Sequence, residues 1–211
     1  MSTQAAAHHE TEHEAGGYVK GAALALVTQN KDPDGLGRVK VRYPWHSQSA
    51  ESYWARIATP MAGKGRGLLV LPEVGDEVLV AFEREDLRFP YVLGGLWNGQ
   101  DAPPEANADG KNNLRLLKTR KGHVLLFDDG SPGRIELKLN DGKMVHIDDD
   151  KIEITDGTAN SISIDSKGGV ITLQSSTSLT LKSAQISVES SGSLTLKGAT
   201  VTIQGATINL N

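Results

Sequence analysis

The last third of the chain repeats one short apolar pattern. Pairs of aliphatic residues, each separated by a single residue, start nine, eight, seven, eight, seven and seven positions apart. The pairs are Ile162/Ile164, Ile171/Leu173, Leu179/Leu181, Ile186/Val188, Leu194/Leu196, Val201/Ile203 and Ile208/Leu210. Because residues i and i+2 of a β-strand face the same side, each pair predicts a short strand with two inward aliphatic side chains and one outward residue between them.

A unit of seven or eight residues cannot bury two aliphatic side chains by itself. A single-chain solenoid of hexapeptides steps by six residues and other single-chain coils use longer turns, so the observed period fits neither well. The absence of aromatic residues after Phe127 agrees with a narrow axis that has no room for rings. We therefore expect three identical chains to intertwine as a trimeric β-helix, a needle, whose axis is lined by the pairs from Ile171/Leu173 to Val201/Ile203.

The same stretch also has the composition of a flexible linker, because 20 of the 57 residues from Thr155 to Asn211 are Ser or Thr. A random linker does not keep the Ile-x-Ile spacing through seven units, so the needle is the better interpretation. Where the needle begins stays open. The earlier pairs Leu125/Phe127, Ile135/Leu137 and Val145/Ile147 fit either a flared neck or the needle itself.

Residues 17 to 100 read as an ordinary globular β-domain. Strand patterns cover residues 17–27, 37–43, 53–60, 77–84 and 91–96, and no window has a convincing helical period. Within the second strand Val39, Val41 and Tyr43 alternate with basic residues, which predicts one buried face and one wet face. Five strands in fewer than 90 residues suit a small closed barrel of the OB type, so the whole chain is predicted to be all-β.

Composition and charge exclude several classes of function. The chain has no cysteine, a net charge of -4, and no apolar run near the roughly 18 residues that a membrane-spanning helix needs. The first residues lack the basic start and apolar stretch of a secretory signal, so synthesis and assembly in the cytoplasm are expected. The acidic balance argues against a protein whose affinity comes from neutralising phosphates.

Four local clusters could carry chemistry, and each has a plainer interpretation. They are His8, His9 and His13 in a flexible tail of residues 1–16, the acids Glu83, Glu85 and Asp86 in a turn, the acids Asp148, Asp149 and Asp150 between two strands, and the glycine-rich loop Gly63 to Gly67. None has the spacing or the partner residues of a metal site, an acid–base pair or a phosphate-binding loop. We therefore predict no catalytic residue, no metal site and no cofactor.

Four separated blocks of the first domain resemble a known family. They are residues 32–45 (DPDGLGRVKVRYPW), 54–58 (WARIA), 72–82 (PEVGDEVLVAF) and 90–99 (PYVLGGLWNG). In this order they resemble the OB domain of the VgrG and phage baseplate-spike family over residues 17 to 103, and residues 134 to 211 are similar to the needle that follows it. The expected domains are a tail (1–16), the barrel (17–100), a linker and neck (101–133) and the needle (134–211).

The resemblance implies the central spike of a contractile injection system: a phage tail, a type VI secretion apparatus or an extracellular phage-tail-like particle. It implies a homotrimer whose barrels dock against one another and against a baseplate hub protein, and which leaves the cell with the particle on contraction. Transient contact with a target membrane, and effector cargo carried by the spike, belong to the same expectation.

Two departures from the family refine this expectation. Only about 16 residues precede the barrel, so the hub is expected to be another polypeptide, and residues 101 to 113 form a linker where some phage spikes carry a lysozyme domain. No His-x-His tip closes the needle, which predicts that a PAAR-type tip protein binds at its end. The docking residues would be Ile208, Asn209, Leu210 and Asn211.

Two alternatives come from other classes of protein. A nucleic-acid-binding OB protein could use the basic strand Arg38, Lys40 and Arg42 with Tyr43, Trp45 and Trp54 as stacking platforms. A receptor-binding tail fibre could also carry a β-helix, although a globular head would be expected after it.

Overall fold

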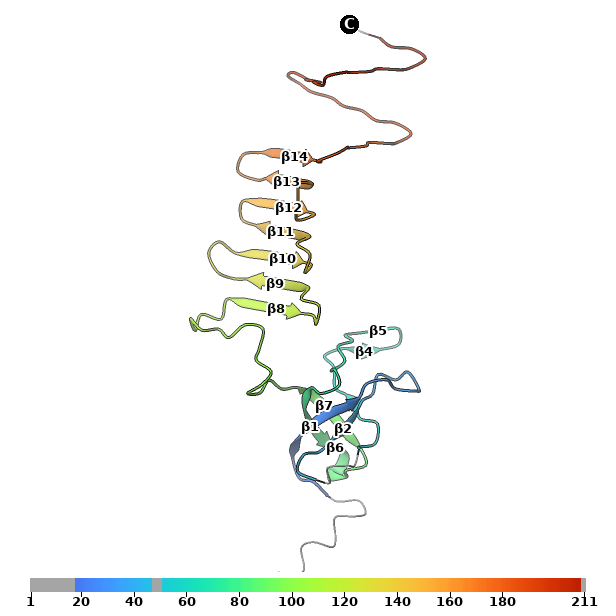
Figure 1. The fold of residues 1–211 in the computed structure, drawn as a ribbon, viewed down its shortest axis with the longest axis vertical. Helices are drawn as coiled ribbons and strands as arrows, with labels where there is room; N and C mark the ends of the chain where they lie inside the picture. The colour runs from blue at the N-terminus through green and yellow to red at the C-terminus, as the bar shows by residue number, and fades with distance from the viewer. Residues whose placement is uncertain (1–17, 47–50, 210–211) are drawn as a thin grey trace, which may run out of the picture. The chain divides into compact units, whose positions relative to one another are not determined.

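A computed structural model describes residues 18–46 and 51–209, and the chain divides into two compact units, residues 1–106 and 107–211 (Figure 1). Within the described residues the regular structure is β apart from the 3-10 turn η1 (Glu83–Glu85), which confirms the all-β prediction. No helix among these residues is long and apolar enough to cross a membrane. The predicted tail of residues 1–16 lies outside the described part.

The first unit is a small closed barrel. Its main sheet has the order β2-β1-β6-β7-β3, antiparallel except where β3 runs parallel to β7. The barrel closes between Val39 and Ala55, each of which donates its backbone N–H to the carbonyl of the other, at 3.0 and 2.7 Å. The strands are β1 (Ala22–Gln29), β2 (Lys40–Arg42), β3 (Arg56–Ile57), β6 (Glu77–Phe82) and β7 (Pro90–Gly95).

The core of the barrel follows the strand alternation. On β6 every second residue, Val78, Val80 and Phe82, is buried, and the residues between them are half-buried. Val39, Val41 and Tyr43 are buried as predicted, and the Tyr43 ring meets the Phe82 ring edge-on at 5.6 Å. A period of two therefore places one face of each strand in the barrel interior.

A hairpin projects from the barrel where the sequence predicted a flexible loop. Strands β4 (Ala62–Gly63) and β5 (Arg66–Gly67) pair across the two-residue turn Lys64-Gly65. Gly65 has a φ of 66°, which suits glycine in a tight hairpin turn. We call residues 61–71 the arm.

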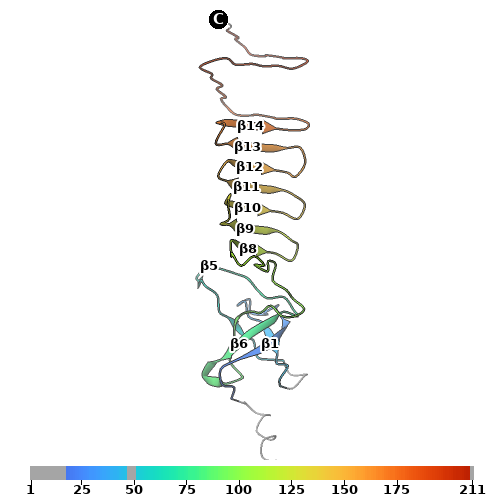
Figure 2. The same ribbon diagram turned by 90° about the vertical axis from the view of Figure 1, so that its left-hand side faces the viewer.

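The second unit begins with an antiparallel meander (Figures 1 and 2). Its sheet keeps the sequence order from β8 to β14, and every described strand has five residues. The strands are β8 (Leu114–Lys118), β9 (Val124–Asp128), β10 (Arg134–Lys138), β11 (Met144–Asp148), β12 (Lys151–Thr155), β13 (Ser161–Asp165) and β14 (Val170–Gln174). After β14, residues 175–209 have no assigned strand.

Aspartates shape the turns of the meander. Asp141 and Asp165 each accept a backbone N–H from the residue two positions later, as does Asp156 from Thr158 at 2.9 Å. This side-chain bond stabilises a reversal directly after or near the end of a strand. Two turns also approach each other closely: a Cβ added at Gly157, whose φ is 78°, would lie 2.9 Å from the backbone of Gly142.

The hydrogen bonds of the meander differ from those expected of an intertwined needle. The first two apolar pairs, Ile162/Ile164 and Ile171/Leu173, lie on β13 and β14, which pair with each other inside one chain. The other five pairs fall in residues 175–211, where the described residues have no strand partner in their own chain. Intertwining of three chains is therefore a proposal for residues 175 onward.

Candidate trimerisation surface

One face of the meander carries two continuous rows of apolar side chains. Cross-strand register aligns the residues of each row from strand to strand, so they form ladders across the whole sheet. Ladder 1 is Leu117, Leu125, Leu137, Val145, Ile154, Ile162 and Leu173, and ladder 2 is Phe127, Ile135, Ile147, Ile152, Ile164 and Ile171. On β8 the position of ladder 2 is occupied by Arg115, which pairs with Asp129 at the rim.

The ladders lie open in the single chain. Apart from the half-buried Val145, their exposed fractions run from 36% for Ile164 to 70% for Ile171, whereas the core of the barrel is 8% exposed or less. A sheet that presents so much contiguous apolar surface to water marks an interface rather than a free surface. The ladder face is therefore the candidate functional site of this unit.

The opposite face of the meander is polar over its central strands. Glu136, His146 and Glu153 occupy neighbouring positions on β10, β11 and β12. The His146 ring nitrogens face Glu136 Oε1 at 3.1 Å and Asp148 Oδ2 at 2.8 Å, and Lys151 Nζ donates to Glu153 at 2.8 Å. Side chains that bond to one another in this way suit a face that stays in contact with water.

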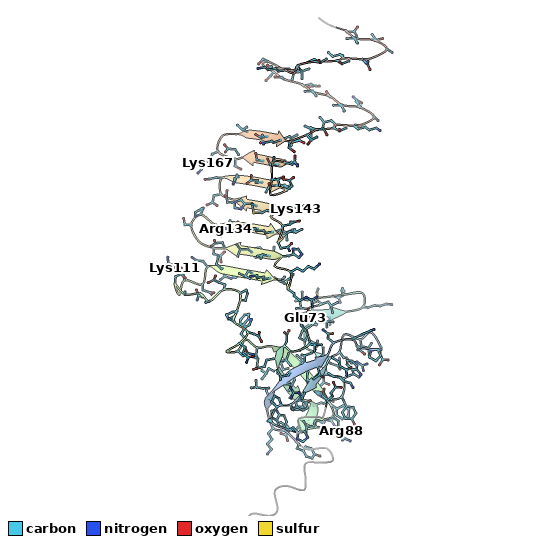
Figure 3. All side chains as sticks on the ribbon, viewed as in Figure 1. Glu73, Arg88, Lys111, Arg134, Lys143 and Lys167 are labelled. Carbon is cyan, nitrogen blue, oxygen red and sulfur yellow. The ribbon has the colours of Figure 1, made fainter. Side chains whose placement is uncertain are left out.

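Asp148 is held in its charged form. The hydrogen bond with His146, together with the backbone N–H groups of Asp150 and Lys151, lowers the pKa of Asp148 from 3.8 to about 2. Charged side chains also lie at the turns on both sides of the sheet. Arg134 and Lys167 lie on one side, and Lys143 lies on the other (Figure 3). On β8 and β9 the opposite face carries Leu116 and the buried Leu126, so it is over the central strands that the ladder face is the exposed apolar face of the sheet.

The extended segment continues the pattern of the ladders. Leu179, Leu181, Ile186, Val188, Leu194, Leu196, Val201 and Ile203 are all more than half exposed. Ile171 and Leu173, the first predicted axis residues, end the two ladders on β14. Of the predicted tip residues, Ile208 and Asn209 are exposed, and Leu210 and Asn211 lie outside the described residues.

The remaining candidates behave as turns rather than as chemical sites. Tyr91 donates its hydroxyl to Glu83 at 2.6 Å, and Asp86 pairs with Arg88. Asp148 accepts the backbone N–H groups of Asp150 and Lys151 in the turn before β12, which agrees with the interpretation of the three aspartates as a turn. Residues 18–46 and 51–209 contain no group of three His, Asp or Glu side chains able to hold a metal ion. His8, His9 and His13 lie outside these residues.

Two residues of the basic strand, Arg38 and Lys40, pair with acidic residues of their own chain. Arg38 pairs with Asp32 at 2.8 Å and Asp34 at 2.6 Å, and its hydrogen bonds hold the pKa of Asp32 far below the usual range. Arg38 and Lys40 both lie over the Trp54 ring, at 5.8 and 5.5 Å. Tyr43 is buried in the core, whereas Trp45 is 47% exposed, so the three rings named for base stacking do not lie together on one open platform.

Sequence reasoning missed two parts of the candidate surfaces. Leu117 was not recognised as a ladder member, although it stands two residues after Arg115 in a strand pattern. The arm was also missed, since the run Leu68-Leu69-Val70 looks like a buried strand but is exposed.

A small β-barrel followed by a sheet with one exposed apolar face is typical of a protein that assembles with other copies through that face. Two family models agree with this class. The OB domain of type VI secretion system and phage-baseplate injectors matches residues 23–97, and the phage baseplate V C-terminal trimerisation domain matches residues 115–168. The chain belongs to this family of VgrG and phage-baseplate spike proteins.

Curated relatives agree with the family. The type VI secretion system spike protein VgrG1a of Pseudomonas aeruginosa is 33% identical over 135 residues, which cover 59% of this chain and 20% of the relative. The spike protein VgrG3 of Vibrio cholerae is 36% identical over 104 residues, 46% of this chain and 10% of the relative. The actin cross-linking toxin VgrG1 of Vibrio cholerae is 31% identical over 104 residues, again 10% of that protein. The chain thus spans a fifth or less of these relatives.

Proposed function

We propose that this chain is the structural central spike of a contractile injection system. Three copies would bring their ladder faces together around one axis, and residues 175 onward would intertwine above that sheet prism. The observation that carries the proposal is the continuity of the apolar pattern, from two exposed ladders into an extended segment with the same spacing, in a chain that matches a trimerisation domain.

The geometry suits a spike that must resist bending when a force acts along its length. In the meander the backbone hydrogen bonds run from strand to strand along the stack, so bending the shaft requires many of them to deform together. Residues 175–209 have no strand partner in their own chain, so their backbone groups would bond to the other two chains. A chain could then not leave the needle without breaking bonds to both neighbours.

The proposed work is mechanical, with no bond chemistry. Support comes from the relatives, among which spike proteins of type VI secretion systems recur. The toxin relative matches over a tenth of its length, so its named activity does not transfer to this chain. The spike would be assembled in the cytoplasm, join a tail-like particle and be delivered on contraction. It would contact the target membrane transiently and could carry effector proteins.

Two partners complete the proposal. A baseplate hub protein would hold the barrel end, and a PAAR-type tip protein would cover the last apolar layer of the needle. The exposed Ile208 supports the second partner, because an apolar side chain in water favours a binding surface that would cover it. Deleting residues 206–211 should abolish capture of a PAAR-type protein while the trimer persists. Unchanged affinity would place the docking surface elsewhere.

The test of the spike uses the full chain. Light scattering should return three times the chain mass of 22.5 kDa. An affinity-tagged chain in its own host should then purify with contractile particles and be labelled at their baseplate end in electron micrographs. A folded monomer, or a trimer that never joins a particle, would refute the proposal.

A further inference from the structure

The barrel unit carries two separate exposed apolar surfaces. The first is the arm, where Met61, Leu68, Leu69 and Val70 are exposed and Leu69 reaches 77%. The second lies outside the barrel wall, on the face of β1, β6 and β7 that points away from the core. We call the second surface the outer patch; it consists of Leu24, Trp45, Leu79 and Leu93.

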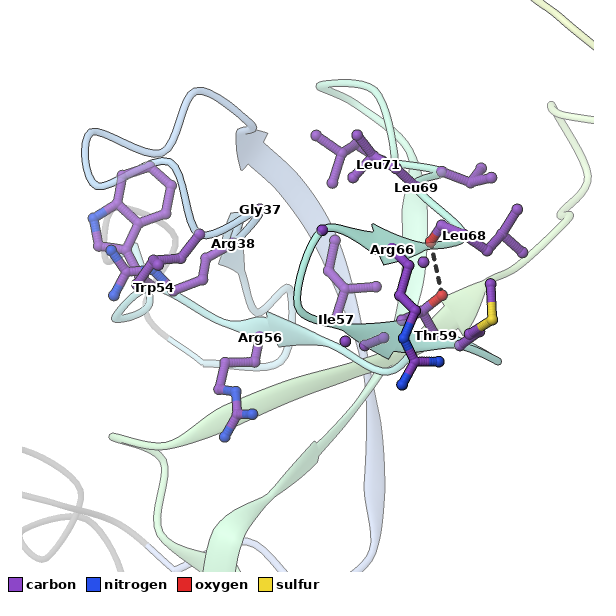
Figure 4. A pocket seen from close by; sticks show the side chains of 17 residues that line it. Gly37, Arg38, Trp54, Arg56, Ile57, Thr59, Arg66, Leu68, Leu69 and Leu71 are labelled. Carbon is purple, nitrogen blue, oxygen red and sulfur yellow. Dashed lines mark hydrogen bonds between the residues drawn. The ribbon is translucent and has the colours of Figure 1, made fainter.

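Two hydrogen bonds fix the conformation of the arm. Leu68 donates its N–H to Met61 O at 3.0 Å, and Thr59 Oγ1 donates to Leu68 O at 2.8 Å. Between the arm and the barrel lies an open cleft of about 900 Å³, with Leu68 and Leu69 on one side and Trp54 on the other (Figure 4). The arm is thus a defined hairpin whose apolar side chains Leu69 and Val70 stay mostly exposed among the described residues.

The outer patch results from the strand alternation. Ala25 and Val27 point into the core, so Leu24 points outward, next to Leu79 in the register of β1 and β6. Trp45 is fixed beside them because its indole N–H donates to Leu24 O at 3.1 Å. Leu24 and Leu93 are 49% and 47% exposed, so the arm of the same chain does not cover them.

A three-fold assembly requires two such surfaces. In a closed ring of three identical units each interface is heterologous, so one surface of each copy meets a different surface of the next copy. The trimerisation domain lies in the same chain as the barrel, joined to it by the 18 residues between Gly95 and Leu114. A linker of that length spans roughly 25 Å as a flexible chain, which keeps neighbouring barrels at effective concentrations of about millimolar.

We propose that the arm of each copy packs its apolar side chains onto the outer patch of the next copy, so that three barrels form a closed ring. The partner is a second copy of this chain, because the trimerisation domain brings a second barrel, with its own exposed outer patch, within reach of each arm. The inference rests on the three-chain assembly proposed above and adds the surfaces by which the barrels recognise one another.

Cross-linking tests this arrangement directly, because the natural chain has no cysteine. The full-length double variant Leu69→Cys/Leu93→Cys, treated with a short bismaleimide, should give covalent dimers and trimers on a denaturing gel. Each single variant should give none, since the proposed contact places Leu69 of one copy against Leu93 of the next and neither residue against its own copy. The matched control Leu69→Cys/Tyr18→Cys pairs the arm with an exposed residue outside the patch and should also give none.

The outcomes separate this inference from the proposed function. A trimer by light scattering without cross-chain product from the double variant refutes the arm-to-patch contact alone, as does cross-linking of Leu69→Cys by itself. Absence of the trimer refutes the assembly. A measurement without reagent gives a second check: Leu69→Asp should lower the melting midpoint of the barrel, whereas Lys64→Asp at the arm turn should not. Equal midpoints for both variants and the natural chain would overturn the contact.

Discussion

Replacing Ile162 by Ala measures what the ladder face contributes to assembly. Ile162 is 46% exposed in the single chain, so the trimer has a little under half of this side chain left to bury. Since full burial of isoleucine is worth about 2 kcal/mol, assembly should gain about 1 kcal/mol per chain and about 3 kcal/mol per trimer at this position. Loss of about 3 kcal/mol in the Ile162→Ala variant corresponds to a trimer that associates roughly a hundredfold more weakly.

The assay is denaturation at several protein concentrations, because the midpoint of a trimer rises with concentration. The control is Ser163→Ala, the next residue on the same strand, which points to the polar face and should change stability by less than about 0.5 kcal/mol. Equal losses for the two variants, or a midpoint of Ile162→Ala that matches the natural chain at every concentration, would mean that the ladder face is not the interface.

Three further predictions concern the needle, a charged turn and a close approach of two turns. Leu194→Asp should abolish or strongly weaken the trimer in light scattering while Thr195→Asp leaves it intact, because the axis would place three carboxylates in one apolar layer. Asp148→Asn should destabilise the protein at neutral pH, and the difference should vanish as the pH falls from 3.8 to about 2, since a lowered pKa stabilises the fold above the ordinary pKa and loses that effect through the folded one. Gly157→Ala should cost more stability in urea than Gly169→Ala, because both have positive φ but only the first meets neighbouring backbone at 2.9 Å; equal costs would contradict the close approach.

The face of each strand could be predicted from the sequence. The alternation at Val39 and Val41 places both in the barrel core, and the spacing of Ile162 and Ile164 places both on the ladder face, one in each ladder. The partner of each strand could not be predicted in this way, because an i, i+2 apolar pair fits a strand bonded to its own chain or to another.

Spacing between strands supplies only part of the missing information. Strands β8, β9, β10 and β11 start ten residues apart, which leaves five residues for a reversal after a five-residue strand. The pairs after Ile171 start seven or eight residues apart. That spacing alone does not exclude a reversal, because β11 and β12 start seven residues apart and still pair antiparallel. The arm was unreadable for a different reason: Leu68, Leu69 and Val70 have the composition of a core strand, and only the fold leaves them exposed.

The antiparallel order of β8 to β14 constrains how this family member can change its length. Each strand carries the chain across the sheet, so successive turns lie on opposite sides of it. Loss of a single strand would therefore make the chain leave the sheet on the other side, and every later turn would change sides. Loss or gain of two neighbouring strands, about 20 residues at the common spacing of ten, keeps the side on which the chain leaves the sheet and the register of both ladders. Changes in the length of the meander are therefore expected in whole hairpins, two strands at a time. Residues 175–209 contain no paired strand and are not held to that rule.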